Sequence, residues 1–170
     1  VASRGLGDVY KRQGSLLILK VKNRDAPLLL QETRNKAGFL VMRTIAAIAT
    51  PPGRGGIGIV RMSGPMSLDI LKRIFKTKKE IKPRFMHYGH IAYEDKIIDE
   101  VMACYFKGPY SYTTEDMVEI YCHGGYVSTL YIYEIILKEG AVQADAGEFT
   151  KLAFLNGRID LLEAEAVSGI

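Results

Sequence analysis

The sequence contains no tryptophan and two cysteines, Cys104 and Cys122, among its 170 residues. Two cysteines without a CxxC spacing do not form a disulfide framework or a zinc site. We therefore expect no metal site and a reducing, cytoplasmic setting. No run of residues is apolar for long enough to cross a bilayer, so we expect no membrane association. The hydrophobic content of 48% is nevertheless typical of a globular protein.

The main part of the chain also lacks an excess of either charge. Residues 1–41 contain 8 Lys/Arg and 3 Asp/Glu, whereas residues 42–170 contain 15 and 16. The formal net charge of +4 therefore arises in the leading segment, and the remainder has a net charge of −1. Such a balance does not predict an electrostatic surface for nucleic acid, and direct RNA binding is the weakest of the functions considered.

Residues 1–41 differ from the rest in pattern as well as in charge. The opening VASRGLGDVYKRQ has no apolar period, and the first methionine is Met42. GLGDVYKRQ resembles peptides that arise when sequencing adaptors are translated. We therefore expect residues 1–41 to be a non-native leader from upstream or adaptor translation. In the alternative interpretation they are a genuine extension, with SLLILKVK as an added strand.

From Met42 onward, apolar periodicity and turn residues predict strands mixed with helices. A β-hairpin turns at EDK, and the lysine-rich KTKKEIKPR is expected to be a solvated connector. Expected strands cover 44–50, 57–63, 84–93, 97–106, 117–122 and 141–146. Expected helices run from Pro65 through Phe75, over 126–139, over 148–155, and onward from a capping box of Asp160 and Glu163. This mixture favours an α+β fold with a mixed sheet and packed helices over a doubly wound sheet.

The stretch TPPGRGGIGIVRMSGP, residues 50–65, raises the question of a phosphate-binding loop. A P-loop requires GxxxxGK[ST], but Gly58 is followed by Ile59 and Val60, so the lysine and the hydroxyl are missing. A dinucleotide fingerprint requires a third glycine and a following helix, whereas this stretch enters a strand. The glycines are therefore expected to form a tight turn where backbones approach closely, with Arg54 exposed in that turn.

Two charged residues interrupt apolar strands. Strand alternation places Arg61 on one face with Ile59 and Ser63. In the strand MVEIYCH, Glu119 shares a face with Tyr121 and His123. A buried charge must be paired or specifically solvated, so two interpretations stay open. Arg61 and Glu119 form a structural ion pair, or both face a pocket for a polar ligand.

Three ordered blocks carry a family resemblance that covers Met42 to Ile170 almost continuously. They are MRTIAAIATPPGRGGIGIVRMSGP at 42–65, GPYSYTTEDMVEIYCHGG at 108–125 and GEFTKLAFLNGRIDLLEAEAV at 147–167. These blocks resemble the N-terminal part of the tRNA modification GTPase family, MnmE, also called TrmE. The resemblance does not extend to residues 1–41.

The resemblance implies a fold similar to the folate-binding aminomethyltransferase, the glycine-cleavage T-protein. It implies a folate-binding and dimerisation domain over 42–158 and the start of a truncated helical domain over 159–170. Members of the family use a tetrahydrofolate derivative, 5-formyl- or 5,10-methylene-tetrahydrofolate, together with GTP, Mg²⁺ and K⁺. They act as homodimers with a flavoprotein partner, MnmG or GidA, on the wobble uridine of certain tRNAs. This chain contains none of the GTPase motifs, so we expect folate binding and dimerisation but no GTP hydrolysis and no catalytic residue.

Three positions match the folate-contacting residues of the family: Arg61, Glu119 and Arg158. A carboxylate such as Glu119 accepts paired N–H donors from the pterin ring, and the fork-shaped arginines suit the carboxylates and carbonyls of the folate tail. Without the resemblance, Arg158 is expected to be an ordinary surface residue. The residues expected at the pocket edge are Tyr110, Tyr112, Tyr121 and His123.

The sequence departs from the family pattern at three positions. Ala146 replaces a proline, Leu152 replaces an arginine, and Thr114 stands where glycine is usual. The missing arginine at position 152 puts in doubt an electrostatic role for the helix that precedes Arg158. Two other functions remain open: a stand-alone aminomethyltransferase-like folate enzyme, and a purely structural dimerisation module.

Overall fold

The computed structural model describes residues 11–13, 16–19, 40–53 and 55–168, and the chain divides into two compact units at Arg43. The first unit contains a three-stranded sheet in the order β1-β2-β3 with antiparallel neighbours. Its strands are β1 (Lys11–Gln13), β2 (Leu16–Leu19) and β3 (Leu40–Met42). Most of the predicted leader and Arg54 lie outside the described residues. The strand β2 falls within SLLILKVK, while the origin of residues 1–41 stays a prediction.

The second unit, Thr44–Ile170, is built on a seven-stranded mixed sheet in the order β10-β4-β5-β9-β8-β7-β6. The pairing of β10 with β4 is parallel, and the other pairs are antiparallel. The strands are β4 (Ile45–Ile48), β5 (Ile57–Ser63), β6 (Phe75–Lys76), β7 (Met86–Tyr93), β8 (Lys96–Phe106), β9 (Met117–His123) and β10 (Val142–Gln143).

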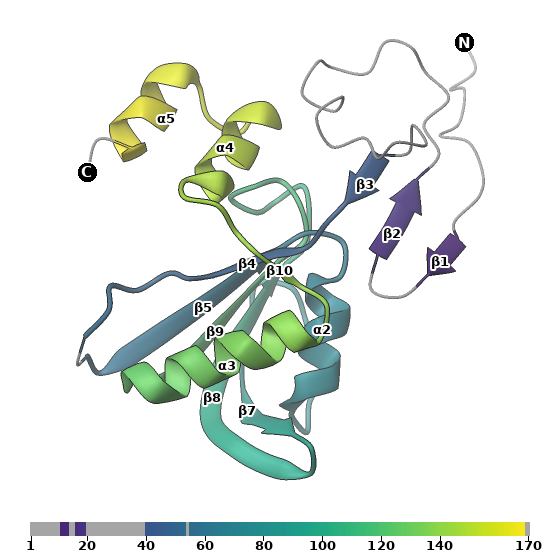
Figure 1. Ribbon diagram of the computed structural model, residues 1–170, viewed down its shortest axis with the longest axis vertical. Coiled ribbons are helices and arrows are strands. Elements are labelled where there is room, and N and C mark those ends of the chain that lie inside the picture. The colour runs from purple at the N-terminus through teal and green to yellow at the C-terminus, as the bar shows by residue number, and fades with distance from the viewer. Residues whose placement is uncertain (1–10, 14–15, 20–39, 54, 169–170) are drawn as a thin grey trace. The chain divides into compact units, whose positions relative to one another are not determined.

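Four helices complete the described part of this unit, which confirms the predicted α+β class. They are α2 (Ser67–Ile74), α3 (Tyr126–Lys138), α4 (Glu148–Leu155) and α5 (Leu161–Ser168). Figure 1 shows α3 lying across one face of the sheet. Buried side chains of α2 and α3, such as Ile70 and Ile132, join strand residues such as Val60 and Ile120 in one core cluster. We call the opposite face, where Arg61 and Glu119 lie, the outer face.

The hairpin and most of the helices follow the sequence closely. The turn between β7 and β8 is made by Glu94 and Asp95, both at positive φ, which suits a two-residue hairpin turn. At the start of α5, the backbone N–H of Asp160 donates to Glu163 and that of Glu163 donates to Asp160, at 3.0 and 2.8 Å. The predicted capping box is therefore confirmed.

The helix predicted from Pro65 through Phe75 is shorter than the apolar pattern indicated. It begins at Ser67 and ends at Ile74, and Phe75 belongs to the strand β6. Phe75 pairs with Ile91 of β7 and is 4% exposed. Phe75 is therefore buried in the core as part of a strand. Helical spacing does not predict this, because the pairing with β7 is a tertiary contact.

Candidate functional site

Arg61 and Glu119 face each other across two neighbouring strands. Arg61 of β5 lies directly opposite Glu119 of β9. The Arg61 Nε donates to Glu119 Oε1 at 2.8 Å, and a terminal guanidinium nitrogen lies 2.7 Å from the same oxygen. The side chains are 31% and 13% exposed, so the pair lies at the surface of the sheet and remains accessible on the arginine side. The sequence placed each residue correctly within its strand.

Tyr121 donates a further hydrogen bond to the Glu119 carboxylate. Its hydroxyl donates to Glu119 Oε2 at 2.5 Å. Burial raises the pKa of Tyr121, and so does the hydrogen bond to the Glu119 carboxylate. The phenol therefore remains protonated and donates at neutral pH. Glu119 is thus held from both sides, by a cation on one oxygen and by a neutral donor on the other.

The helix α4 reaches the ion pair from a distant part of the chain. The guanidinium carbon of Arg61 lies 5.7 Å from the centroid of the Phe149 ring, within the range of a cation–π contact. Two hydrogen bonds join this region to the loop before β9. Tyr112 Oη lies 3.2 Å from Thr150 Oγ1, and Asn156 Nδ2 donates to the Thr113 carbonyl at 2.7 Å. The third family block therefore meets the first one in space.

A buried polar cluster supports the same end of the sheet. Ser63 Oγ donates to Glu115 Oε2 at 2.7 Å and lies 2.6 Å from Thr113 Oγ1. Burial raises the pKa of Glu115, the Ser63 hydrogen bond opposes this, and the neighbouring carboxylate of Glu148 adds to it. Glu115 was not among the predicted site residues. An acidic residue in the TTED segment, directly before an apolar strand, is the signal that could have identified it.

Three further predicted residues, Arg158, Tyr110 and His123, lie in three different places. Arg158 is exposed just after α4, and its backbone N–H donates to the Ala153 carbonyl at 2.8 Å. Tyr110 is 71% exposed, and its ring lies 5.1 Å from the guanidinium carbon of Arg84. His123 occupies the far end of β9. The structure therefore brings Arg61, Glu119 and Tyr121 together and does not place Tyr110 or His123 in contact with them.

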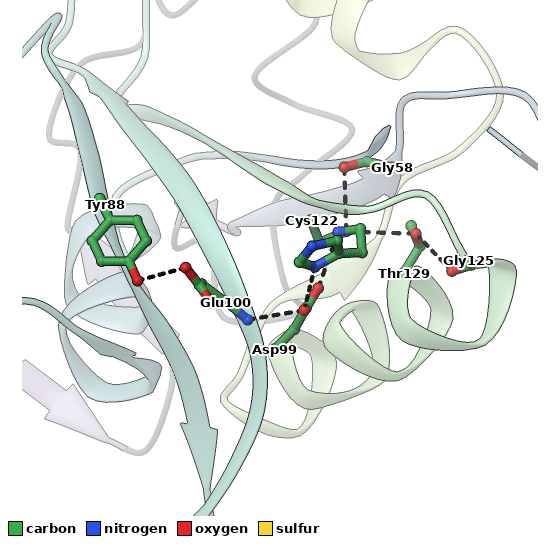
Figure 2. Close-up of polar contacts among 8 residues, drawn as sticks. Gly58, Tyr88, Asp99, Glu100, Cys122, Gly125 and Thr129 are labelled. Carbon is green, nitrogen blue, oxygen red and sulfur yellow. Dashed lines mark hydrogen bonds and ion pairs between the residues drawn. The ribbon is translucent and has the colours of Figure 1, made fainter. Parts of the chain in front are cut away.

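His123 is held by a carboxylate on the neighbouring strand β8. Its Nδ1 lies 2.7 Å from Asp99 Oδ1, and its backbone N–H donates to Asp99 Oδ2 at 3.0 Å. Figure 2 shows Asp99 beside Glu100, whose carboxylate accepts a 2.5 Å hydrogen bond from the Tyr88 hydroxyl. A cavity of about 340 Å³ adjoins these groups, lined by Tyr88, Tyr121 and His123 among others. Asp99 was missed by sequence reasoning, although an acidic residue within IIDEVM marks it.

The glycine-rich stretch forms a turn that feeds β5, as predicted. A Cβ atom at Gly58 would lie 2.0 Å from Thr129 Oγ1, and one at Gly124 would lie 2.0 Å from the Gly55 carbonyl oxygen. Gly58 is therefore required by the Thr129 side chain, and Gly124 by the close approach of the backbone at Gly55. The turn and the start of α3 border a cavity of about 450 Å³, which contains no lysine of the P-loop kind.

No group of three or more His, Cys, Asp and Glu side chains in the described part of the chain is arranged to hold a metal ion. No helix described here combines the length and apolar character that crossing a membrane would require. The contacts among Arg61, Glu119 and Tyr121 make the outer face the candidate site.

The fold and this cluster define an α+β domain that presents an arginine–carboxylate pair on the outer face of a mixed sheet. A family model described as "GTP-binding protein TrmE N-terminus" matches residues 44–158. The chain belongs to this family of TrmE N-terminal domains. The matched residues contain the whole sheet and the ion pair, and end at Arg158.

Curated relatives carry the name tRNA modification GTPase MnmE. The chain is 57% identical over 131 residues to the protein from Alkaliphilus metalliredigens, covering 73% of this chain and 28% of the relative. It is 55% identical over 129 residues to that from Clostridioides difficile, with coverage of 73% and 28%. It is 53% identical over 138 residues to that from Thermoanaerobacter pseudethanolicus, with coverage of 77% and 30%. The chain thus spans less than a third of the length of these relatives.

Proposed function

We propose that this domain binds a tetrahydrofolate one-carbon donor, 5-formyl- or 5,10-methylene-tetrahydrofolate, at the Arg61–Glu119 pair. The observation that carries the proposal is a carboxylate and a guanidinium held together on the outer face with the arginine 31% exposed. The Tyr121 hydroxyl contacts the Glu119 carboxylate and the Phe149 ring contacts the Arg61 guanidinium, so the site offers a ligand both polar and aromatic contacts. The proposal includes a fold similar to the aminomethyltransferase T-protein.

The hydrogen-bonding capacity of Glu119 fits such a ligand. A carboxylate offers about four acceptor positions. Three donors occupy them here, two from Arg61 and one from Tyr121. A pterin ring carries an N–H and an amino group side by side, and these match a carboxylate. Binding would replace the neutral Tyr121 donor on Oε2 and one of the two Arg61 contacts on Oε1, so that each oxygen accepts one pterin donor and Arg61 retains the other contact.

The α4 side of the site suits the remainder of the folate. Arg158 follows α4 and is exposed, so its guanidinium is available to a glutamyl carboxylate. Phe149 of α4 contacts Arg61 directly, and Tyr112 contacts the next residue of α4, Thr150. When bound, the folate supplies the one-carbon unit. The protein residues hold and orient it.

The experiment that tests this proposal is a calorimetric titration of the chain with 5-formyltetrahydrofolate. Glu119→Gln keeps the size of the side chain but removes the charge. Loss of one charge-assisted hydrogen bond, about 1.5–3 kcal/mol, weakens binding roughly tenfold to a hundredfold. Arg158→Ala is expected to weaken it by a smaller factor.

A matched control is a second arginine–glutamate pair, Arg73 with Glu139. Glu139→Gln removes a comparable ion pair from α3's C-terminal end and is expected to leave folate affinity unchanged. Unchanged affinity in Glu119→Gln, or equal losses in the two variants, would contradict the assignment of the folate site. No binding by the folded parent chain would favour the structural ion pair.

We also propose that the whole protein is a cytoplasmic tRNA modification GTPase that works as a homodimer with an MnmG-like flavoprotein on wobble uridines. The family membership supports this, and the domain contributes folate binding and dimerisation.

Exposed apolar residues near the start of α3 support a self-association surface: Ile57 is 60% exposed, Tyr126 54% and Val127 78%. Sedimentation of Val127→Lys is expected to show monomers. The control Ile97→Lys, at a residue that is 71% exposed on the hairpin, should remain dimeric.

A further inference from the structure

The positive charge of the second unit is concentrated in one segment. Residues 42–170 contain 15 Lys/Arg and 16 Asp/Glu, and residues 72–84 alone contain seven of the former and one of the latter. Eight cations and fifteen anions remain elsewhere. The near-zero net charge of residues 42–170 is therefore the sum of a basic segment, 72–84, and an acidic remainder. A local concentration of charge, and not the net charge, determines the potential that a polyanion meets.

The fold presents all seven cations to solvent. They come from the last turn of α2, from β6 and from the connector between β6 and β7, and each is exposed. Arg73 is paired with Glu139, and Lys76 Nζ donates to the Arg73 carbonyl. We call this set the basic surface: Lys72, Arg73, Lys76, Lys78, Lys79, Lys82 and Arg84.

Exposed aromatic rings lie beside the basic surface. Phe85 is 63% exposed, Tyr88 56% and Tyr110 71%. The guanidinium carbon of Arg84 lies 5.1 Å from the Tyr110 ring centroid. Phe85 follows Arg84 in the chain, whereas the Tyr88 hydroxyl donates to the Glu100 carboxylate at 2.5 Å and leaves the ring exposed. Single exposed apolar residues are ordinary on a protein surface, but these three rings share one region with the basic surface.

Backbone pairing fixes the rings and the cations relative to each other. Lys76 of β6 lies opposite His90 of β7, so Lys76, His90 and Tyr88 share the outer face. The Thr77 hydroxyl donates to the Tyr88 carbonyl at 2.9 Å, which holds the start of the connector against β7. Lys78 and Lys79 come directly after Thr77 in the chain, so this hydrogen bond keeps them close to Tyr88.

We propose that the basic surface and the three exposed rings bind an unpaired segment of RNA. Lysine and arginine side chains neutralise phosphates, and exposed rings stack on bases that are not paired. An acidic protein would use the cations but would not require three stacking rings. The choice of RNA rests on the proposed role in tRNA modification, while the surface itself rests on the described residues.

The experiment measures fluorescence anisotropy of the full chain with a labelled anticodon stem–loop RNA over a range of salt concentrations. Lys78→Gln with Lys79→Gln is compared with Lys96→Gln with Lys138→Gln, which remove two exposed lysines elsewhere. The slope of log affinity against log salt falls by about 0.7 per lost phosphate contact on a single strand. The first double variant is therefore expected to lower the slope by about 1.4, and the control is expected to leave it unchanged.

The rings are tested with Phe85→Ala and Tyr88→Ala. Stacking of a base on an aromatic side chain predicts a loss of about fivefold to 150-fold for each variant, without a change in salt slope. Equal losses in both lysine variants, or full affinity in both ring variants, would overturn the proposal. Undiminished binding of heparin or of vesicles rich in anionic lipid, with no binding of the RNA, would also overturn it.

A folate titration of the same variants separates this inference from the proposed function. Lys78, Lys79 and Phe85 lie outside the Arg61–Glu119 contacts, so their variants are expected to keep the folate affinity of the parent. RNA binding without folate binding would support the surface and contradict the folate site. Folate binding without RNA binding would do the reverse.

Discussion

Asp99 holds His123 at two points, through the backbone N–H at 3.0 Å and through ring Nδ1 at 2.7 Å. Because a carboxylate only accepts hydrogen bonds, Nδ1 carries a proton and Nε2 is the free acceptor of the neutral ring. Asp99 also accepts the backbone N–H of Glu100 at 2.9 Å. The two hydrogen bonds to Asp99 fix the orientation of the ring beside the neighbouring cavity. Because the ring is 72% exposed, it remains accessible to protons.

This arrangement predicts a pH dependence of stability. The hydrogen bond to Asp99 and its negative charge raise the pKa of His123 above the ordinary 6.5. Stabilisation from the protonated ring is therefore complete below pH 6.5 and declines as the pH rises through the raised value. Denaturant unfolding across this range is expected to show the decline in the parent chain and to lose it in His123→Gln.

Asp99→Asn tests the cause of the shift. An amide in place of the carboxylate removes the charge, so the pKa of His123 should return toward its ordinary value. NMR titration of the His123 ring measures this directly. An unchanged titration in Asp99→Asn would show that the ion pair is not what raises the pKa.

Truncating Glu119 is expected to lower the free energy of unfolding more than truncating Arg61. Glu119→Ala leaves Arg61 and the Tyr121 hydroxyl without their acceptor, and the expected loss of unfolding free energy is about 1–3 kcal/mol. The exposure of Arg61 keeps the loss toward the lower end, because water replaces part of the interaction. Arg61→Ala leaves Glu119 bound to Tyr121 and is expected to cost less. Thermal or urea unfolding of both variants provides the comparison, and an equal or larger loss in Arg61→Ala would contradict it.

Gly58 predicts a steric effect that has a matched control. An added Cβ atom would meet Thr129 Oγ1 at 2.0 Å and Thr129 Cγ2 at 3.1 Å. Overpacking of this kind costs about 1–3 kcal/mol, and Thr129→Ala should restore part of it by removing both atoms. Gly56→Ala is the control, since no heavy atom lies within 4 Å of the position its Cβ would take. A full loss that Thr129→Ala does not relieve would point to backbone strain.

The Ser63–Glu115 hydrogen bond predicts a change in a carboxyl titration. Burial raises the pKa of Glu115 above 4.5, and Ser63 opposes the rise. The contribution of Glu115 to stability is therefore greatest below pH 4.5 and declines as the pH increases through the raised value. Ser63→Ala should raise this pKa further and destabilise the protein more at neutral pH than in acid. NMR titration of the Glu115 carboxyl carbon and unfolding at both pH values measure these effects, and a lowered pKa would contradict them.

Local patterns in the chain predicted most of the secondary structure. Period-two alternation identified Arg61 and Glu119 as charges within apolar strands, and the strand carrying Arg61 covers the predicted residues 57–63. The capping box of Asp160 and Glu163 follows from a spacing of three residues. The end of α2 could not be predicted in this way, because Phe75 leaves the helix to pair with β7. Such pairing competes with local preference and is absent from any short window of sequence.

The sequence by itself determined which residues are unusual, and the tertiary structure decided which of them meet. Strand alternation assigned Arg61 and Glu119 to faces but left their relation open. Only the antiparallel register of β5 and β9 sets them opposite each other across 58 positions of the chain. A slip of β9 by one residue in that register would turn Glu119 to the face opposite Arg61. The physical reason is that backbone hydrogen bonds between distant strands fix the register, and no local preference encodes them.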